Sequence, residues 1–182
     1  SGFNSVMIDG SEYPFEENIA VTKKVVDEAH AHGVAVEGEI GVVAGVEDDI
    51  VVNQDSAIYT TPEEAIEFKK RSGVDFLAAA IGTAHGFYKT EPRLDIDTLR
   101  EIRKKTDYPL VVHGGTGLSE ETVRELVEAG ACKFNVSTQI KQTYIDSMYN
   151  YIEKKRTEYN ILKVLARGKE ELVEMIAGYI RL

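Results

Sequence analysis

Hydrophobic and polar positions follow two rhythms along the chain, and the rhythms alternate from end to end. Short apolar runs are typical of buried strands, whereas the longer amphipathic stretches between them are typical of helices. The expected strands are Ser5–Asp9, Val34–Ile40, Asp75–Gly82, Pro109–His113 and Lys133–Val136. The expected helices are Glu16–His32, Pro62–Ser72, Ile96–Thr106, Glu120–Ala129, Thr138–Lys155 and Lys169–Ile180.

Local signals mark where several of these helices begin and end. Thr61 precedes Pro62 and a pair of glutamates, which is the order of a capping residue, a first-turn proline and acidic first-turn residues. Gly33, Gly73 and Gly130 stand where helices should stop. Strict alternation of strand and helix predicts an α/β fold with parallel strands. This pattern leaves a barrel and a doubly wound sheet both open.

Composition narrows the class of protein. The 182 residues are enough for about one domain, although a complete (β/α)8 barrel typically needs about 250. The net charge of −10 is spread along the helices and argues against a nucleic-acid partner, because phosphates require a basic surface. Cys132, the single cysteine, lies in an apolar stretch and predicts a buried thiol in a reducing compartment. We find no long apolar run or signal peptide and expect a cytoplasmic protein with no membrane partner.

One connection, Gly41–Thr61, is long for a loop between a strand and a helix, and such loops are usually functional or disordered. It carries the acidic run Glu47, Asp48 and Asp49. A mobile surface excursion and an active-site lid that carries a carboxylate fit this loop equally well. A base that removes a proton next to a carbonyl group must reach the substrate while water is excluded. Glu47 suits that role, with Asp48 and Asp49 as competitors.

Polar side chains gather at the carboxyl end of each predicted strand, the edge where parallel α/β folds place their active sites. His85 and His113 end successive predicted strands, and each is followed by glycine. Either histidine alone is best explained as a neutral, hydrogen-bonded residue at a strand edge. The pair, with Glu39 nearby, favours a metal ion, although a catalytic zinc takes about three protein ligands. Asp9, at another strand end, is suited to positioning a ligand or orienting a metal-bound histidine.

A glycine-rich turn follows His113. Gly114 and Gly115 allow backbone N–H groups to approach an anion closely, and Thr116 adds a hydroxyl group. The segment 135–138 then opens a helix whose N-terminus favours phosphate. A tight turn and a helix cap are the simpler explanation, but two adjacent anion-binding edges make phosphate the better interpretation. Lys89 either adds positive charge nearby or is a surface lysine.

These residues resemble the class II, zinc-dependent ketose-bisphosphate aldolases, the fructose- and tagatose-bisphosphate group. The matching stretches keep the family's order and cover nearly the whole chain. They are Ser5–Ser11, Val36–Gly41, Gly45–Asp48, Ala57–Thr60, Ile81–Gly86, His113–Gly117 and Asn135–Thr138. The resemblance implies a TIM (β/α)8 barrel that assembles as a dimer or tetramer. Residues 1–182 would then be the C-terminal portion of a single barrel domain and supply about strands 4–8.

The resemblance also implies roles for individual residues. His85 and His113 match two of the three zinc histidines, Glu39 and Asp9 match acidic positions near the metal, and Glu47 matches the loop glutamate that moves the proton. Lys89 matches a position beside a monovalent cation and the phosphate. The residues that match the pocket for dihydroxyacetone phosphate are Gly86, Gly114, Thr116, Asn135, Ser137 and Thr138.

The implied reaction is reversible cleavage of a ketose 1,6-bisphosphate, fructose or tagatose, to dihydroxyacetone phosphate and glyceraldehyde 3-phosphate. The family's Leu-Asp-His-Gly type motif, which supplies the third zinc histidine and an acid–base aspartate, does not occur here. We therefore expect the chain to need an N-terminal barrel segment. One alternative is a non-catalytic sugar-phosphate-binding or partner subunit. Another is a Schiff-base aldolase using Lys133, a residue we expect to start its strand and to be solvated.

Overall fold

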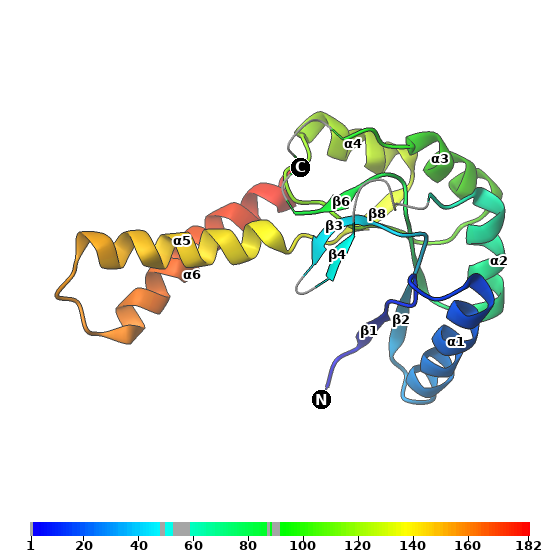
Figure 1. The fold of residues 1–182 in the computed structure, drawn as a ribbon, viewed down its shortest axis with the longest axis horizontal. Helices are drawn as coiled ribbons and strands as arrows, with labels where there is room; N and C mark the ends of the chain where they lie inside the picture. Colours follow the sequence, from blue (N-terminus) through cyan, green and yellow to red (C-terminus); the bar gives the residue numbers. More distant parts are fainter. Residues whose placement is uncertain (1, 48–49, 53–58, 87, 89–91) are drawn as a thin grey trace.

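A computed structural model describes residues 2–47, 50–52, 59–86, 88 and 92–182, with only the backbone described at 44–47 and 50–52. Its main sheet has five strands, paired in the order β1, β2, β5, β7 and β8 (Figure 1). They are Ser5–Ile8 (β1), Ala35–Ile40 (β2), Phe76–Ala79 (β5), Leu110–Val112 (β7) and Ala131–Phe134 (β8). The sequence predicts each of these strands, although β8 begins two residues earlier than expected.

Strand order decides between the two fold types that the sequence pattern leaves open. Each strand of the main sheet pairs with the next main-sheet strand along the chain, and every pair is parallel. A doubly wound sheet reverses its order at a switch point, whereas a barrel keeps it. The sheet is therefore an arc of a barrel-type α/β fold. Within the described residues, β1 and β8 each pair with a single strand.

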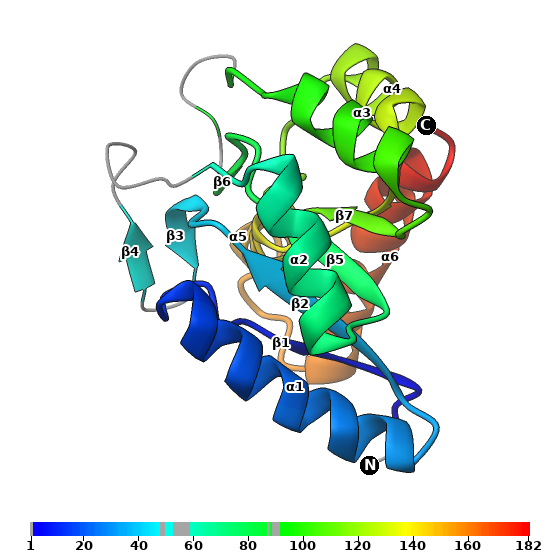
Figure 2. The same ribbon diagram turned by 90° about the vertical axis from the view of Figure 1, so that its right-hand side faces the viewer.

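Helices cover one face of this arc, and each packs against the next along the chain (Figure 2). They are Phe15–Ala31 (α1), Pro62–Ser72 (α2), Ile96–Lys105 (α3) and Glu120–Ala129 (α4). The start of α2 confirms the predicted capping: the Thr61 side chain accepts from the backbone N–H of Glu64, whose carboxylate accepts from the N–H of Thr61. Such caps satisfy N–H groups that have no partner within the helix.

The hydrophobic core lies between these helices and the sheet. Phe68 from α2, Leu99 from α3 and Leu126 from α4 pack with Leu77 of β5 and Leu110 of β7, and all five are fully buried. Burying a side chain of this size contributes about 1.5–3 kcal/mol. The core therefore anchors each strand from its helix side and leaves the opposite side of the sheet for other residues.

The alternation of side chains along β2 sends its carboxylates away from the helices. A Cβ atom at Gly38 would contact Val74, Phe68 and Thr22, so position 38 faces the helices. Successive side chains of a strand point to opposite faces. Glu37 and Glu39 therefore project from the concave face of the arc, where they remain 3% and 2% exposed.

The long connection after β2 contains regular structure, so its interpretation as a simple loop is wrong. Its residues Ala44–Glu47 (β3) and Ile50–Val52 (β4) form an antiparallel pair. The strand β3 also pairs in parallel with Ala84–His85 (β6), with Gly45 opposite His85. The backbone pairing of β3 with β6 thus forms a strand in a segment whose glycine-rich, polar sequence favours a loop. The surface excursion and the active-site lid that the sequence allows both remain predictions for this segment.

The last two helices form a hairpin that extends away from the sheet (Figure 1). They are Thr138–Lys154 (α5) and Ile161–Ile180 (α6). α6 begins eight residues before the predicted Lys169, because the side chain of Asn160 caps it by accepting from the N–H of Leu162. Gly168 of α6 allows close packing against α5, since a Cβ atom there would lie 2.8 Å from the ring of Tyr144.

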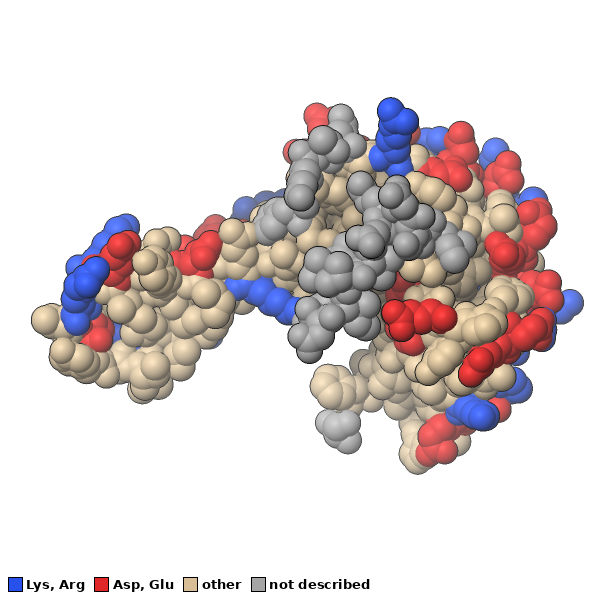
Figure 3. Space-filling view, in the orientation of Figure 1, with Lys and Arg blue, Asp and Glu red and all other residues tan. Residues whose placement is uncertain are grey.

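Charged side chains of both signs are interspersed over the face shown in Figure 3. Ion pairs join neighbouring helices, for example Lys105 to Glu63 at 2.6 Å. Within the described ranges, no helix is long and apolar enough to cross a membrane. The prediction of a buried thiol is wrong: Cys132 is exposed, because β8 pairs on one side alone among the described strands.

A buried hydroxyl group joins the ends of β2 and β5, and its removal tests this joint. Thr60 is 3% exposed; its hydroxyl donates to the Ile40 carbonyl at 3.0 Å and accepts from the Ala80 N–H at 3.1 Å. We predict that Thr60→Val lowers the free energy of unfolding by about 1–3 kcal/mol, because it removes both bonds at unchanged volume. Thr60→Ser keeps the hydroxyl and should lose less. Chemical denaturation measures both, and equal losses would contradict the prediction.

Candidate functional site

Polar residues from the carboxyl ends of the strands line a cavity of about 270 Å³. Most of the predicted site residues meet there. The lining residues that the sequence predicts are Asp9, His85, Gly86, His113, Gly114, Thr116, Asn135, Ser137 and Thr138. Met7 and Lys141 also line it and were not predicted. The position of Lys141, one helical turn beyond Ser137 and Thr138, is the sequence signal that could have found it.

The two histidines of interest face each other across this cavity. Their ring centres are 6.0 Å apart and the ring planes are inclined by 36°. His85 comes from β6 and His113 directly follows β7. An ion that lies about 2.1 Å from one nitrogen of each ring fits this separation. The pair is therefore arranged to share one ligand, as their positions at two strand ends predict.

His113 lies between two buried carboxylates. Its Nε2 is 2.9 Å from Glu37 Oε1, and its Nδ1 is 3.1 Å from Glu39 Oε2. Burial alone would lower the pKa of His113, but the hydrogen bonds to Glu37 and Glu39 outweigh burial and raise this pKa to about 9. The imidazole ring is therefore protonated between the two glutamates, and this environment favours a positive charge.

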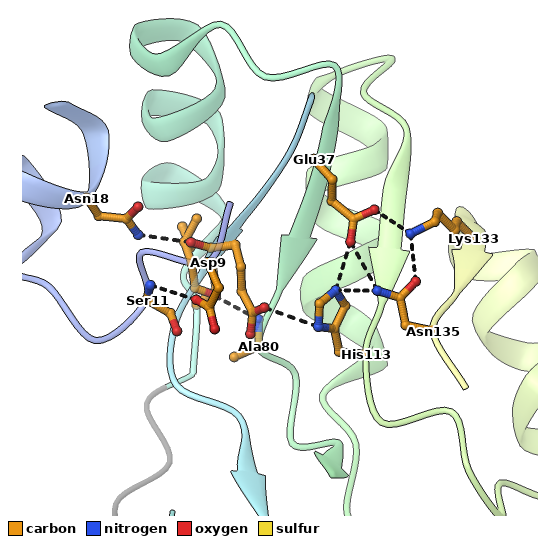
Figure 4. Close-up of polar contacts among 11 residues, drawn as sticks. Asp9, Ser11, Asn18, Glu37, Ala80, His113, Lys133 and Asn135 are labelled. Atoms are coloured by element: carbon orange, nitrogen blue, oxygen red, sulfur yellow. Dashed lines mark hydrogen bonds and ion pairs between the residues drawn. The ribbon is translucent and has the colours of Figure 1, made fainter. Parts of the chain in front are cut away.

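Glu37 belongs to a wider hydrogen-bonded network (Figure 4). Lys133 donates to Glu37 Oε2 at 2.5 Å and to Asn135 Oδ1 at 2.7 Å, and Asn135 Nδ2 lies 3.2 Å from Glu37 Oε1. Burial would raise the pKa of Glu37, but the bonds from His113 and Lys133 lower it to about 2. Lys133 is exposed, as expected, but its predicted place at the strand start is wrong: it is the third residue of β8, and its ammonium group contacts Glu37 beside the site.

The glycine-rich turn is held in place by a tyrosine that sequence reasoning missed. The hydroxyl of Tyr88 donates to the Gly114 carbonyl at 2.8 Å and accepts from the Ala84 N–H at 3.0 Å. Gly114 has φ of +68°, and a Cβ atom there would lie 2.4 Å from the Ala84 carbonyl oxygen. The turn after His113 and the strand that carries His85 therefore approach as closely as glycine permits.

The other end of the cavity is suited to an anion. The helix α5 begins beside Ser137, whose side chain forms no capping hydrogen bond, and its first turn carries no acidic residue. In contrast, α2 and α4 each begin with a pair of glutamates. The N-terminus of a helix attracts negative charge, and Lys141 adds a positive charge to the same cavity.

The remaining predicted residues lie elsewhere. Gly115 donates its N–H to the Asn135 carbonyl at 3.1 Å and does not line the cavity. Glu39 does not line the cavity and contacts it through His113, whereas Asp9, which does line it, also accepts from the N–H of Ser11 at 2.9 Å. Lys89, Asp48, Asp49 and the side chain of Glu47 lie outside the described part of the chain. Their predicted roles remain predictions.

Comparison with known proteins supports the resemblance that the sequence motifs indicate. The family model described as class II fructose-bisphosphate aldolase matches residues 1–182. The chain belongs to this family. A Bacillus subtilis protein named as a probable fructose-bisphosphate aldolase is 42% identical to this aldolase-family chain over 181 residues. The alignment covers all of the chain and 63% of that relative. The resemblance inferred from the motifs is confirmed.

Solved structures of aldolases share the fold. The YdjI aldolase of Escherichia coli K12 superposes with a TM-score of 0.81 and 32% identity, covering 99% of this chain and 61% of that one. The fructose-bisphosphate aldolase of Campylobacter jejuni gives a TM-score of 0.74 and 25% identity, covering 94% and 57%. The TIM-barrel fold class is confirmed. The aldolase-family chain spans less than two thirds of the length of these relatives.

The donors of this aldolase-family chain fit part of a zinc site. Zinc takes imidazole nitrogen and carboxylate oxygen, and His85, His113 and Glu39 supply both types beside one cavity. Among the side chains that the structure describes, no three or more of the ligand types are grouped closely enough to hold a metal by themselves. The described ligands therefore have the atom types that zinc prefers, but they are fewer than a zinc site needs.

Gly114 provides a test of the close approach between the two histidine-bearing segments. Gly33 has nearly the same φ, +69°, but nothing within 4 Å of its added Cβ atom. We predict that Gly33→Ala costs about 1–2 kcal/mol for its left-handed backbone. Gly114→Ala should cost clearly more, because its Cβ atom also collides with the Ala84 backbone. Thermal unfolding of both variants measures this difference, and equal losses of stability would show that the collision is relieved.

Proposed function

We propose that the protein that contains this chain catalyses metal-dependent, reversible aldol cleavage of a ketose 1,6-bisphosphate, fructose or tagatose. The products would be dihydroxyacetone phosphate and glyceraldehyde 3-phosphate. The observation that carries this proposal is the pairing of His85 with His113 in one cavity with an anion-binding helix end. A metal ligand pair and a phosphate site side by side suit a phosphorylated carbonyl substrate.

The proposed metal is zinc, held by His85 and His113 with Glu39 and Asp9 close by. Zinc would act as a Lewis acid that polarises the ketone oxygen and stabilises the charge that develops when the carbon–carbon bond breaks. A further ligand would come from outside the described residues. The two buried glutamates beside His113 support a cationic group here, because their carboxylates stabilise positive charge on or beside the ring.

The chain's own residues would bind the phosphate group. Gly86, Gly114, Thr116, Ser137 and the first turn of α5 line the same cavity, so that backbone N–H and hydroxyl groups of these residues would serve as donors. Gly115 would support this pocket from behind through its bond to Asn135. Lys89 is proposed to lie beside the phosphate and a monovalent cation. The partial positive charge at the N-terminus of α5 and the positive charge of Lys141 support an anion at this end.

The proposed acid–base residue is Glu47. Its protonated carboxyl group would donate a proton to the terminal carbon of the dihydroxyacetone phosphate fragment, and its carboxylate would remove that proton in the condensation direction. Support comes from the backbone pairing of β3 with β6, in which Gly45 lies opposite His85 and Glu47 follows two residues later. The family resemblance also supports assembly as a dimer or tetramer.

Removing a proposed metal ligand tests the metal and the reaction together. In the full-length protein, His85→Ala and His113→Ala should each lose bound zinc and more than about 100-fold in cleavage rate, since outer-shell changes alone cost 10–100-fold. His32→Ala, an exposed histidine at the end of α1, is the control. Elemental analysis and cleavage of both bisphosphates give the readouts.

Two outcomes would overturn this assignment. Stoichiometric zinc without turnover of any ketose bisphosphate would favour the non-catalytic binding subunit. Inactivation by borohydride in the presence of substrate, with indifference to chelators, would favour a Schiff base on a lysine such as Lys133.

The role of Glu47 is tested by separating metal binding from proton transfer. Glu47→Ala should keep zinc and substrate affinity and lose about 10²–10⁴-fold in kcat, the usual contribution of a general acid–base group. Asp48→Ala is the matched control from the same acidic run. Steady-state kinetics and exchange of the substrate proton with solvent measure the effect. An unchanged rate in Glu47→Ala with a slow Asp48→Ala would assign the proton to Asp48.

A further inference from the structure

An ion pair crosses the concave face of the sheet from one strand to a distant one. Glu37 lies on β2 and Lys133 on β8, with β5 and β7 between them in the sheet. The Glu37 side chain is 3% exposed, whereas that of Lys133 is 46% exposed. A buried carboxylate needs a charged partner and further hydrogen bonds to remain ionised. Lys133 provides that partner from the open side of the arc.

Neither residue lines the cavity, yet each contacts residues that do. Glu37 contacts His113, and Lys133 contacts Asn135. The proposed reaction gives them no direct part, because neither reaches the space where a substrate would lie. Their position indicates an action through His113 and Asn135.

Donor and acceptor types fix the orientation of the amide of Asn135. A lysine ammonium has donors and no acceptor, so Asn135 must present Oδ1 to Lys133. Nδ2 then points to Glu37 Oε1 at 3.2 Å and to His113 Nε2 at 2.9 Å. In the same way, Lys133 holds Glu37 Oε2, which leaves Oε1 for His113. One ammonium group thus orients both an amide and a carboxylate.

These contacts determine which nitrogen of His113 can serve as a ligand. Nε2 donates to Glu37 Oε1, which also accepts from the amide of Asn135, and Nδ1 lies 3.1 Å from Glu39 Oε2. A histidine that binds a metal through one ring nitrogen usually donates its other N–H to a carboxylate, which fixes the ring and its tautomer. Glu37 has the position of that carboxylate.

We propose that Lys133 is a positioning residue that, through Glu37 and Asn135, holds the imidazole of His113 with Nδ1 presented to the metal. This inference rests on the proposed function. Lys133 itself touches neither metal nor substrate. Its removal leaves Glu37 without a charged anchor and allows the amide of Asn135 to turn, so the ring of His113 loses its fixed orientation.

The test compares lysines of equal exposure in the full-length protein. Lys133→Met removes the ammonium and keeps the chain length, whereas Lys133→Arg keeps a cationic donor. Lys105→Met is the matched control, because Lys105 is 45% exposed and pairs with Glu63 across two helices at 2.6 Å. Zinc affinity is measured on the metal-free protein by competition with a chromophoric chelator. The absorption spectrum of the cobalt-substituted protein reports the ligand geometry.

We expect Lys133→Met to raise the zinc dissociation constant about 10–100-fold and to change the cobalt spectrum. Lys133→Arg should stay within about threefold, and Lys105→Met should leave both readouts unchanged. With saturating zinc, kcat of Lys133→Met should remain low while KM changes little. Unchanged zinc affinity and cobalt spectrum in Lys133→Met would overturn the proposal.

A double-mutant cycle keeps the test decisive if one variant folds poorly. Because Lys133 acts in part through Glu37, the double variant Glu37→Gln, Lys133→Met should lose less zinc affinity than the two single losses combined. Additive losses would contradict the mechanism. Zinc binding without cleavage of a ketose bisphosphate by the unaltered protein would remove the proposed function and leave the Lys133 test intact. Absence of zinc binding by the unaltered protein would remove both.

Discussion

The concave face of the sheet depends on keeping the carboxylate of Glu37 charged while it is buried. Its three partners come from two strands: His113 follows β7, and Lys133 and Asn135 lie on and just after β8. Because a buried charge without partners is strongly destabilising, these segments must keep their relative positions for the fold to remain favourable. The same contacts orient the groups that border the cavity. Stability and site geometry are therefore set by one network.

Much of the fold follows from signals that are local in the sequence. Pro62–Ser72 and Glu120–Ala129 match their predicted bounds because capping residues and terminal glycines specify both ends. The parallel sheet follows from regular alternation, and the polar strand ends meet at one edge because all main-sheet strands run in the same direction. Strand direction and order place His113 at this edge, whereas His85 lies on β6 in the second sheet and reaches His113 through the segment that follows β5.

Features that depend on distant partners could not be predicted in this way. The strands β3 and β4 form in a glycine-rich, acidic segment because β6 offers a pairing edge. Lys133 has the sequence character of a solvated lysine, and its role depends on Glu37, which lies 96 residues away in the chain. Tyr88 likewise connects two segments, at Ala84 and at Gly114, that come together only when the chain folds. In each case the sequence shows the residue type but not its partner.

The helix α5 has its first turn at the cavity and its other end far out in the hairpin (Figure 1). A helix of 17 residues is about 25 Å long and behaves as a stiff rod. Force applied to its outer end therefore acts as a torque on the first turn. The base of the rod is braced by Tyr179 near the end of α6, whose hydroxyl donates to Gln139 at 2.6 Å and lies 3.5 Å from the N–H of Gly117. The hairpin and the glycine-rich turn are thus mechanically coupled at a point beside the cavity.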